Sequence, residues 1–340
     1  MTVYSLGTAG GPLLRRGLDN GHRRGIATAV VVDGSTYLID CGHGVGMGLA
    51  DAGLSPTSLR AIFITHQHSD HVIDLNSVIV LGGLAFRGNP ELRVRVVGPA
   101  DRGMLPEVQH AEKDVPTIYP QSPTPGTKEM VELMLRSHAT DLNDRRRDSG
   151  APDISKIFIG EDIRLPEEVD FHPNTANHPA MEPFEVYSDK FVTVTATLVQ
   201  HQPIAPAYAF RIDSAYGSVV VSGDTAPSQN LVGLARGCDL LFHEAIDLDS
   251  VIRSYPNATK QELEASMGHH RRAHTTPLDA GAIAQEAGAS HLALHHLVPA
   301  SSNPEAWQTA MTQFRGKLFV PCDGDSFRID DGNVTHQSNS

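Results

Sequence analysis

The run Thr65-His-Gln-His-Ser-Asp-His71 brings three imidazoles and one carboxylate into six consecutive positions. The preceding segment Leu59–Ile64 is apolar except for Arg60. Each of the polar side chains in the run would need its own hydrogen-bond partner inside a protein core. Imidazole and carboxylate groups are, in contrast, common ligands of zinc and similar ions. The run therefore predicts a metal site at the end of a strand.

Three further candidate ligands each follow an apolar run elsewhere in the chain. His201 follows a β-branched run, Asp224 follows three valines and a Ser-Gly pair, and His296 follows Leu-Ala-Leu-His. Strands that end together could deliver these side chains to one rim of a sheet. Two alternatives stay open at this point. Gly-Asp-Thr is also ordinary turn chemistry, and His295 competes with His296 because adjacent strand residues point to opposite faces.

With these motifs the chain resembles the metallo-β-lactamase fold hydrolases. The segments that carry the resemblance are Thr65–His71, His201, Ser222-Gly-Asp-Thr225, Leu294-His-His296 and Leu38-Ile-Asp-Cys-Gly42. Other segments are similar to the branch that holds the long-form ribonuclease Z enzymes and the zinc arylsulfatases, namely Leu6-Gly-Thr-Ala-Gly-Gly-Pro12, His243-Glu-Ala245, His274-Thr-Thr276 and, for the arylsulfatases, Pro203–Arg211. The resemblance covers residues 1–100 and 190–330 and leaves the middle of the chain out.

The resemblance implies a dinuclear metal centre. One ion would be held by His66, His68 and His201, and the second by Asp70, His71 and His296. Asp224 would bridge the two ions together with a hydroxide. A ligand set of nitrogen and oxygen without sulfur favours two zinc ions, and manganese or iron would tolerate it as well. The family pattern Leu-x-Leu-x-His selects His296 rather than its neighbour.

Several polar residues are expected to assist this centre. Asp40 would orient the histidine-rich loop by a hydrogen bond, although it could also cap a following helix. Glu244 and His274 resemble a carboxylate–histidine pair whose imidazole protonates the leaving oxygen. Asp70 is expected to orient the proton of the attacking water as well as to bind metal. The chain departs from the branch at Ile246, where threonine is common.

Two neighbouring histidines, His269 and His270, are rival candidates for the proton-transfer role. They belong to the charged segment Gly268-His-His-Arg-Arg-Ala273. Such a charged segment is typical of a surface in contact with solvent. We therefore expect these two side chains to face solvent, and we assign the proton-transfer role to His274.

The distribution of apolar runs predicts a layered α/β protein. With the resemblance, the expected fold is the four-layer αββα metallo-β-lactamase fold, as one domain over residues 1–340. Strands are predicted at 2–6, 27–32, 36–40, 61–65, 92–98, 191–200, 206–212, 217–222, 239–243 and 291–295, and helices at 227–236, 277–288 and 303–314. An insertion at about 101–190, interrupted by proline and glycine, is expected to form a cap or arm, with Lys128–Ser137 as its clearest helix.

Charge bears on the choice of substrate. The chain carries a net charge of -13, and the insertion holds 10 Lys/Arg against 18 Asp/Glu. Proteins that grip nucleic acid through its phosphates usually show a basic patch, so nucleic acid is disfavoured as a partner. We predict a zinc-dependent hydrolase of a small-molecule ester, an aryl or alkyl sulfate or a phosphate ester. The alternatives are a tRNA 3′-end endonuclease of the ribonuclease Z kind and a lactone hydrolase.

The remaining features concern the compartment and the assembly. The three cysteines lie far apart without a C-x-x-C pair, so no disulfide framework is predicted. No basic and apolar leader opens the sequence, and no apolar run is long enough to span a membrane. We expect a cytoplasmic protein without membrane contact. The resemblance alone implies a homodimer.

Overall fold

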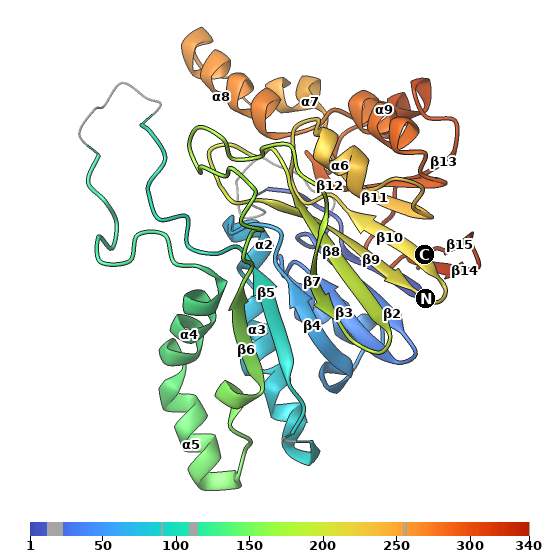
Figure 1. The fold of residues 1–340 in the computed structure, drawn as a ribbon. Coiled ribbons are helices and arrows are strands. Elements are labelled where there is room, and N and C mark those ends of the chain that lie inside the picture. The colour runs from blue at the N-terminus through green and yellow to red at the C-terminus, as the bar shows by residue number, and fades with distance from the viewer. Residues whose placement is uncertain (12–22, 90, 109–114, 254, 256, 340) are drawn as a thin grey trace.

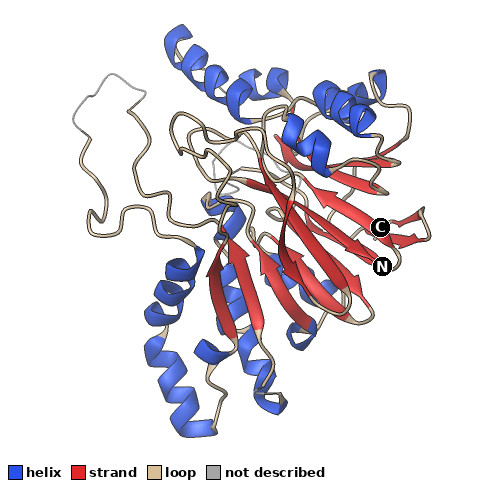
Figure 2. Ribbon diagram, in the orientation of Figure 1, coloured by secondary structure: helices blue, strands red, loops and turns tan. Residues whose placement is uncertain are grey.

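Two facing β-sheets with helices on their outer sides make up the computed structural model (Figures 1 and 2). The structure describes residues 1–11, 23–89, 91–108, 115–253, 255 and 257–339. Pro12 of the N-terminal motif lies outside the described residues. The order of layers is helix, sheet, sheet, helix, as the sequence predicts.

The first sheet is built mainly from the N-terminal half of the chain and is completed by two strands from the C-terminus. Its order is β15-β14-β1-β2-β3-β4-β5-β6. In chain order the strands are β1 (Thr2–Gly7), β2 (Ala27–Val32), β3 (Ser35–Ile39), β4 (Leu59–Phe63), β5 (Val94–Gly98), β6 (Phe158–Asp162), β14 (Ser326–Asp330) and β15 (Asn333–Gln337). Strands β3 to β6 run parallel, so the loops that follow them leave from one edge.

The second sheet comes from the C-terminal half and has the order β13-β12-β11-β10-β9-β8-β7. Its strands are β7 (Phe184–Ser188), β8 (Val192–Leu198), β9 (Tyr208–Ser214), β10 (Gly217–Val221), β11 (Leu240–Ile246), β12 (His291–Val298) and β13 (Lys317–Phe319). Strands β10 to β13 are parallel. Their valine- and leucine-rich runs suit strands that are buried on both faces.

Helices cover the two outer faces. On the side of the first sheet they are α1 (Val45–Asp51), α2 (Ser69–Val72), α3 (Leu75–Val80), α4 (Thr127–Ser137) and α5 (Ala139–Ser149). On the side of the second sheet they are α6 (Gln229–Leu234), α7 (Leu248–Arg253), α8 (Lys260–Ala273), α9 (Pro277–Ala287) and α10 (Pro304–Gln308). Short 3-10 turns lie at Pro56–Ser58, Gly82–Gly88, Ile154–Lys156 and Thr309–Thr312. The predicted helix over 303–314 is therefore split, and α9 begins with Pro277 as predicted.

Residues 101–190 contribute to both sheets as well as to the surface. Strand β6 pairs in parallel with β5 at the edge of the first sheet, and β7 pairs with β8 at the edge of the second. The predicted helix at Lys128–Ser137 is present as α4, and α5 follows it. The described parts of the loop before α4, residues 99–108 and 115–126, extend away from the body beside the open ends of the sheets (Figure 1).

Aromatic side chains fill the space between the sheets. The ring of Phe63 on β4 lies 5.5 Å from that of Phe210 on β9 and 5.6 Å from that of Tyr187 on β7. The hydroxyls of Tyr37 and Tyr187, one from each sheet, both donate to Asp189 Oδ2, at 2.6 Å and 3.0 Å. These contacts join the sheets and fix their separation, which the site at their open ends requires.

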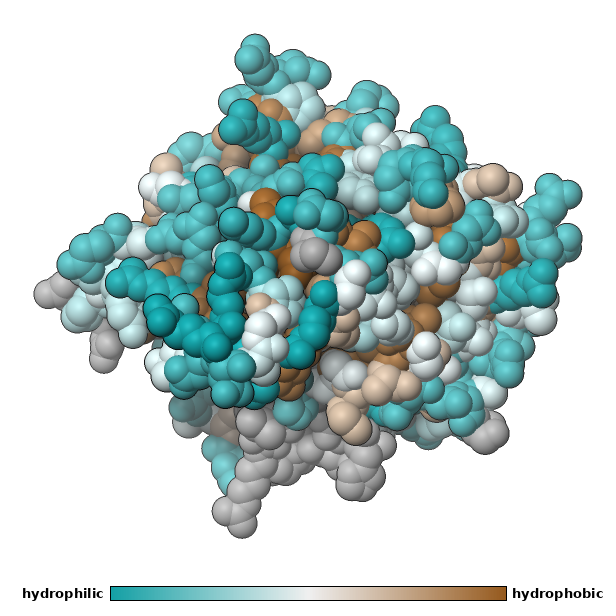
Figure 3. Space-filling view, turned by 90° about the horizontal axis from the view of Figure 1, so that it is seen from below, coloured by the Kyte–Doolittle hydropathy of each residue, from teal (hydrophilic) through white to brown (hydrophobic). Residues whose placement is uncertain are grey.

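The surface is largely polar where it can be seen from below. Hydrophilic residues dominate that face, and hydrophobic residues form small scattered patches on it (Figure 3). Among the described residues, no helix combines the length and the apolar composition that crossing a bilayer would need.

The Phe63→Ala variant is expected to lower the free energy of unfolding by about 3–5 kcal/mol, because it leaves a cavity between the sheets. Urea unfolding followed by circular dichroism would measure the change. Leu133→Ala on α4, where the side chain is 46% exposed, serves as the control and should change stability little. Equal effects of the two substitutions would contradict the placement of Phe63 in the inter-sheet core.

Candidate metal centre

The histidine-rich run begins two residues after β4 and ends in the short helix α2. His66 and His68 lie in the loop, and Asp70 and His71 lie in the first turn of α2. The backbone N–H of Gly11 donates to Asp70 Oδ2 at 2.9 Å, which ties the N-terminal glycine motif to this carboxylate. The loop thus presents all four side chains at the open end of the first sheet.

Asp40 holds this loop in place. It follows β3 and adopts a left-handed backbone conformation with φ of 59°. Its carboxylate accepts hydrogen bonds of 2.8 Å from the Thr65 backbone N–H, the Thr65 hydroxyl and His71 Nδ1. The His71 ring is thereby turned so that Nε2 faces the other candidate ligands. Gly44, not Asp40, occupies the N-cap of α1. Of the two roles predicted for Asp40, the structure therefore shows the orientation of the histidine-rich loop and not the capping of the helix.

Three imidazole nitrogens converge on one point. His68 Nδ1 lies 3.0 Å from His66 Nε2 and 3.1 Å from His201 Nε2. His201 Nδ1 donates to the carbonyl of Ala273 at 2.7 Å, so its Nε2 faces the cluster. Asp224 Oδ2 lies 3.6 Å from His201 Nε2 and 4.0 Å from His66 Nε2. A tetrahedral zinc ion with bonds of 2.0–2.1 Å would require ligand separations of about 3.3 Å, close to these distances.

A second set of donors shares the same aspartate. Asp224 Oδ1 lies 3.3 Å from His71 Nε2 and 3.2 Å from His296 Nε2. Asp70 Oδ2 lies 3.7 Å from His71 Nε2 and 3.4 Å from His296 Nε2. The structure thus brings together all seven residues that were predicted as metal ligands. The two oxygens of Asp224 face the two groups separately.

A bulge in β12 decides between His295 and His296. Glu244 on β11 is paired with His295 while Ala245 is paired with Leu297, so His296 is the extra residue. It has φ of 45° and directs its side chain toward the two aspartates. A Cβ on Gly10 would lie 2.3 Å from the His296 ring, so glycine is needed there. His295 instead packs against Phe242, with ring centroids 5.4 Å apart.

The charges of the site fit a divalent metal ion. Burial lowers the pKa of His66 and His201 well below the usual value and that of His68 to about 4, so these imidazoles are neutral, as ligands must be. His71 Nε2 and Asp224 Oδ1 are buried without a hydrogen-bond partner among the described residues. Burial opposes a charge on His71, but Asp224 and neighbouring carboxylates outweigh it and raise its pKa. A cation bound beside His71 Nε2 and Asp224 Oδ1 would therefore stabilise these carboxylates.

A carboxylate–histidine pair stands beside the donors. His274 Nδ1 donates to Glu244 Oε1 at 3.0 Å, and it lies 3.9 Å from Asp224 Oδ2. The Thr225 backbone N–H also donates to Glu244 Oε1, at 2.8 Å. Glu244 therefore positions both His274 and the loop that carries Asp224. The His274 ring lies 5.0 Å from that of His201 and stacks on that of His296 at 6.1 Å.

The prediction that His269 and His270 face solvent is wrong. Both side chains are half-buried at the C-terminal end of α8. Their rings lie 6.2 Å and 5.9 Å from that of His274, and 5.5 Å from each other. The i,i+4 spacing of His270 and His274 was the signal in the sequence that placed them on one side of the chain.

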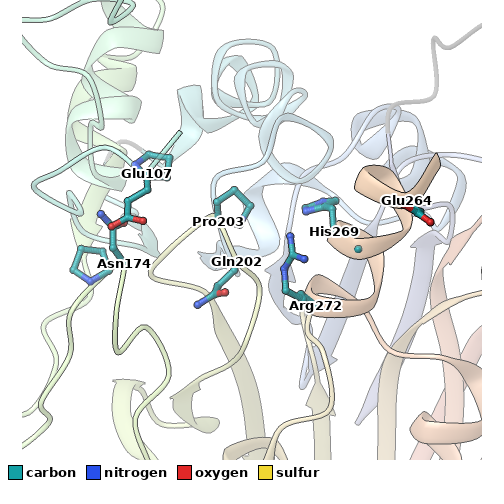
Figure 4. A pocket seen from close by; sticks show the side chains of 10 residues that line it. Glu107, Asn174, Gln202, Pro203, Glu264, His269 and Arg272 are labelled. Atoms are coloured by element: carbon teal, nitrogen blue, oxygen red, sulfur yellow. The ribbon is translucent and has the colours of Figure 1, made fainter. Parts of the chain in front are cut away.

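A cavity of about 490 Å³ lies between α8 and the loop that follows His201 (Figure 4). Glu107 and Asn174 line one side of it, while Glu264, His269 and Arg272 of α8 line the other, with Gln202 and Pro203 between them (Figure 4). Of these residues only His269 was considered for a role at the site from the sequence, and there it was expected to face solvent. The available signal was proximity in the chain, because Gln202 follows His201 and Arg272 precedes His274 by two positions.

Arg102 fixes one wall of this cavity. Its guanidinium donates to the Pro203 carbonyl at 2.9 Å and to Asn174 Oδ1 at 2.8 Å. Asn174 in turn donates to the Leu105 carbonyl at 3.0 Å. The start of the 101–190 segment is thus joined to the loop that carries His201. Arg272, across the cavity, forms no ion pair with a carboxylate of the described residues.

Comparison with known proteins confirms the predicted fold. A family model described as "Anti-Pycsar protein Apyc1" matches residues 27–95. Ribonuclease Z of Mycobacterium bovis is 29% identical over 301 residues, which cover 88% of this chain and 89% of that protein. The crystal structure of human tRNase Z, short form, has a TM-score of 0.61 and 18% identity, and covers 97% of this chain and 99% of its own. The metallo-β-lactamase fold protein YhfI of Bacillus subtilis has a TM-score of 0.58, with 18% identity and 99% of both chains covered.

The Asp40→Asn variant is expected to weaken zinc binding by about 10–100-fold, because His71 and Thr65 lose the carboxylate that orients them. Titration against a chromophoric chelator would measure the affinity. Asp148→Asn on α5, at an exposed position, provides the matched control. Unchanged zinc affinity in Asp40→Asn would show that the loop holds its shape without this carboxylate.

Proposed function

We propose that this metallo-β-lactamase fold protein is a dinuclear-metal phosphodiesterase. In this reaction a water oxygen adds to phosphorus, the bond from phosphorus to one ester oxygen breaks, and a phosphomonoester and an alcohol are formed. The observation that carries the proposal is the pair of donor sets that share Asp224, with the Glu244–His274 pair directly beside them.

The donor sets support two ions. One ion would be held by His66, His68, His201 and Asp224 Oδ2, and the other by Asp70, His71, His296 and Asp224 Oδ1. When bound, two divalent ions supply the Lewis acid and the activated water of this kind of hydrolysis. Zinc suits the nitrogen and oxygen donors and their tetrahedral spacing.

The protein residues around the ions would hold the substrate and move the proton. His274 directs Nδ1 to Glu244, so its Nε2 is left to face the substrate and to protonate the leaving oxygen. Asp70 is fixed by the Gly11 N–H and would orient the attacking water as well as bind metal. Glu244 would act as a positioning residue, because it fixes the tautomer and the orientation of His274.

The substrate is proposed to be a phosphodiester rather than a sulfate ester. The likeness to ribonuclease Z over most of both chains supports phosphodiester chemistry, whereas the arylsulfatase resemblance receives no support from the comparisons. The ester substituent would enter the cavity beside His201, where Arg272 offers a positive charge to an anionic group. The acidic exterior does not oppose an anionic substrate, because the ions dominate the local field.

Transfer RNA is the second candidate substrate, and the same likeness to ribonuclease Z favours it. The 101–190 segment bears on this choice because it carries 10 Lys/Arg against 18 Asp/Glu. In its helix α5, aspartates flank the three arginines Arg145–Arg147, and Arg145 forms an exposed pair with Asp141 at 2.8 Å. This excess of carboxylates opposes binding of an RNA backbone, which basic side chains favour. A small phosphodiester is therefore the preferred substrate.

The first test is hydrolysis of matched nitrophenyl esters by the zinc-loaded protein: bis(p-nitrophenyl) phosphate, the phosphate monoester, the sulfate and a lactone, with a tRNA precursor assayed in parallel. The diester is expected to be hydrolysed fastest. Asp224→Ala should lower its turnover to background, and exposed Asp148→Ala should leave turnover unchanged. Preference for the sulfate, or activity that survives in Asp224→Ala, would refute the proposal. Efficient cleavage of the tRNA precursor would establish the second candidate.

Removal of the proposed proton donor in His274→Ala is expected to lower kcat by about 10²–10⁴-fold for an ester with a poor leaving group. The loss should be much smaller for a p-nitrophenyl ester, whose leaving group needs no protonation. Comparison of a methyl p-nitrophenyl diester with a dialkyl ester would measure the difference. Equal losses for both leaving groups would show that His274 does not donate the proton.

The alkaline limb of the pH profile should depend on Glu244. Burial lowers the pKa of His274, but Glu244 and Asp224 outweigh it and raise that pKa to about 9. An acid is active below its pKa, so activity should fall as pH rises through that region. Glu244→Gln removes the raising charge and should move the fall to lower pH. A pH profile of kcat that is identical in the variant would contradict this role.

A further inference from the structure

The C-terminal end of α8 gathers three histidines into a second imidazole cluster. One ring nitrogen each from His269, His270 and His274 lies within 4.8 Å of the others. The three rings are 5.5, 5.9 and 6.2 Å apart, arranged around a common centre. Three imidazoles in this arrangement, once deprotonated, are a common donor set for zinc.

The geometry resembles that of a donor set already described in the same protein. The rings of His66, His68 and His201 lie 4.6, 4.8 and 5.0 Å apart. The α8 cluster is only about 1 Å wider, a difference that rotation about the side-chain bonds of His269 and His270 can close. Both residues are held on one helix turn, so little else has to move.

The surroundings of His274 also suit a metal ligand. A histidine that binds metal through one ring nitrogen usually donates its other N–H to a carboxylate. Glu244 provides this contact, since it accepts from His274 Nδ1 at 3.0 Å and is itself buried. The Nε2 atom of His274 is therefore the one that can bind an ion. His269 lines the cavity of Figure 4, which gives an ion a route from solvent.

We propose that His269, His270 and His274 form a third, inhibitory site for zinc. An ion that binds there displaces the Nε2 proton of His274 to solvent and takes up the lone pair, so this nitrogen can neither take up nor deliver a proton. It also stands at the wall of the cavity through which the substrate reaches the main centre. Zinc in excess of the two catalytic equivalents then switches the enzyme off. The inhibitory effect rests on the proposed function, whereas the binding site itself does not.

Zinc binding tests the site without reference to activity. The protein loaded with its tightly held zinc is dialysed against increasing zinc, and bound metal is measured by atomic absorption. The wild type is expected to bind one equivalent more than His270→Gln. His269→Gln should lose the same equivalent of zinc. Agreement between the two variants would show that the loss does not come from a defect of one of them. Arg271→Gln, an exposed substitution on the same helix turn, should keep it.

Inhibition is measured on bis(p-nitrophenyl) phosphate and on a dialkyl phosphodiester as zinc is raised. Wild-type turnover of the dialkyl ester should fall by about 10²-fold as the extra equivalent binds, and His270→Gln should retain its activity. Binding that is identical in wild type and His270→Gln would overturn the site. An extra equivalent that binds at this site without inhibition would overturn the regulatory role alone. Failure to hydrolyse any phosphodiester would refute the proposed function and leave the binding result to stand.

Discussion

The buried carboxylate of Asp224 is the constraint on which the rest of the structure depends. It is 2% exposed, and its two oxygens face imidazoles from both sheets. An isolated charge in such a place would cost several kcal/mol, so a cation held by the imidazoles on each side of the carboxylate would stabilise it. The fold must therefore hold four imidazoles close to this carboxylate. Those of His71 and His296 lie on one side of it, and those of His66 and His201 lie on the other.

The two sheets satisfy this requirement by bringing the ends of their strands to one rim. The histidine-rich run follows β4, His201 follows β8, Asp224 follows β10, and His296 interrupts β12. A shift of one residue along a strand moves a side chain by about 3.3 Å and turns it to the other face. The aromatic contacts between the sheets and the hydrogen bonds of Asp40 resist such shifts. Packing of the core thus determines the geometry of the metal centre.

Much of this centre could be predicted from the sequence, because its ligands come directly after apolar strands. Strand alternation alone could not choose between His295 and His296, since it does not show the bulge in β12 where His296 is the extra residue. Only the resemblance to the family selected His296. Helix α8 was not predicted, because its charged composition leaves no apolar stripe that can be recognised in the sequence. Its start was nevertheless encoded in the capping box of Thr259 and Glu262. The cavity could not be found either, because segments distant in the chain meet there.

The short strands of the 101–190 segment were also missed, and for a related reason. Strand β6 has only one buried residue, Phe158, and β7 has only Tyr187, so neither shows a clear apolar pattern. Both are edge strands whose position is fixed by the neighbours β5 and β8. Tertiary pairing decides the conformation of such sequences more than local preference does. Likewise, α5 has no buried residue and packs only Leu142 against the core, so it offers no broad hydrophobic face to recognise.

The pairing of β1 has a consequence for the order in which the molecule is assembled. This first strand lies between β2 and β14, and the amino group of Met1 donates to the carbonyl of Ile329 at 3.1 Å. During synthesis one edge of β1 therefore stays open until nearly the whole chain has emerged, and closing such distant contacts is slow. Asp224 and His296 also arrive late. A metal ion could therefore meet the complete set of seven candidate ligands only after most of the chain has been made.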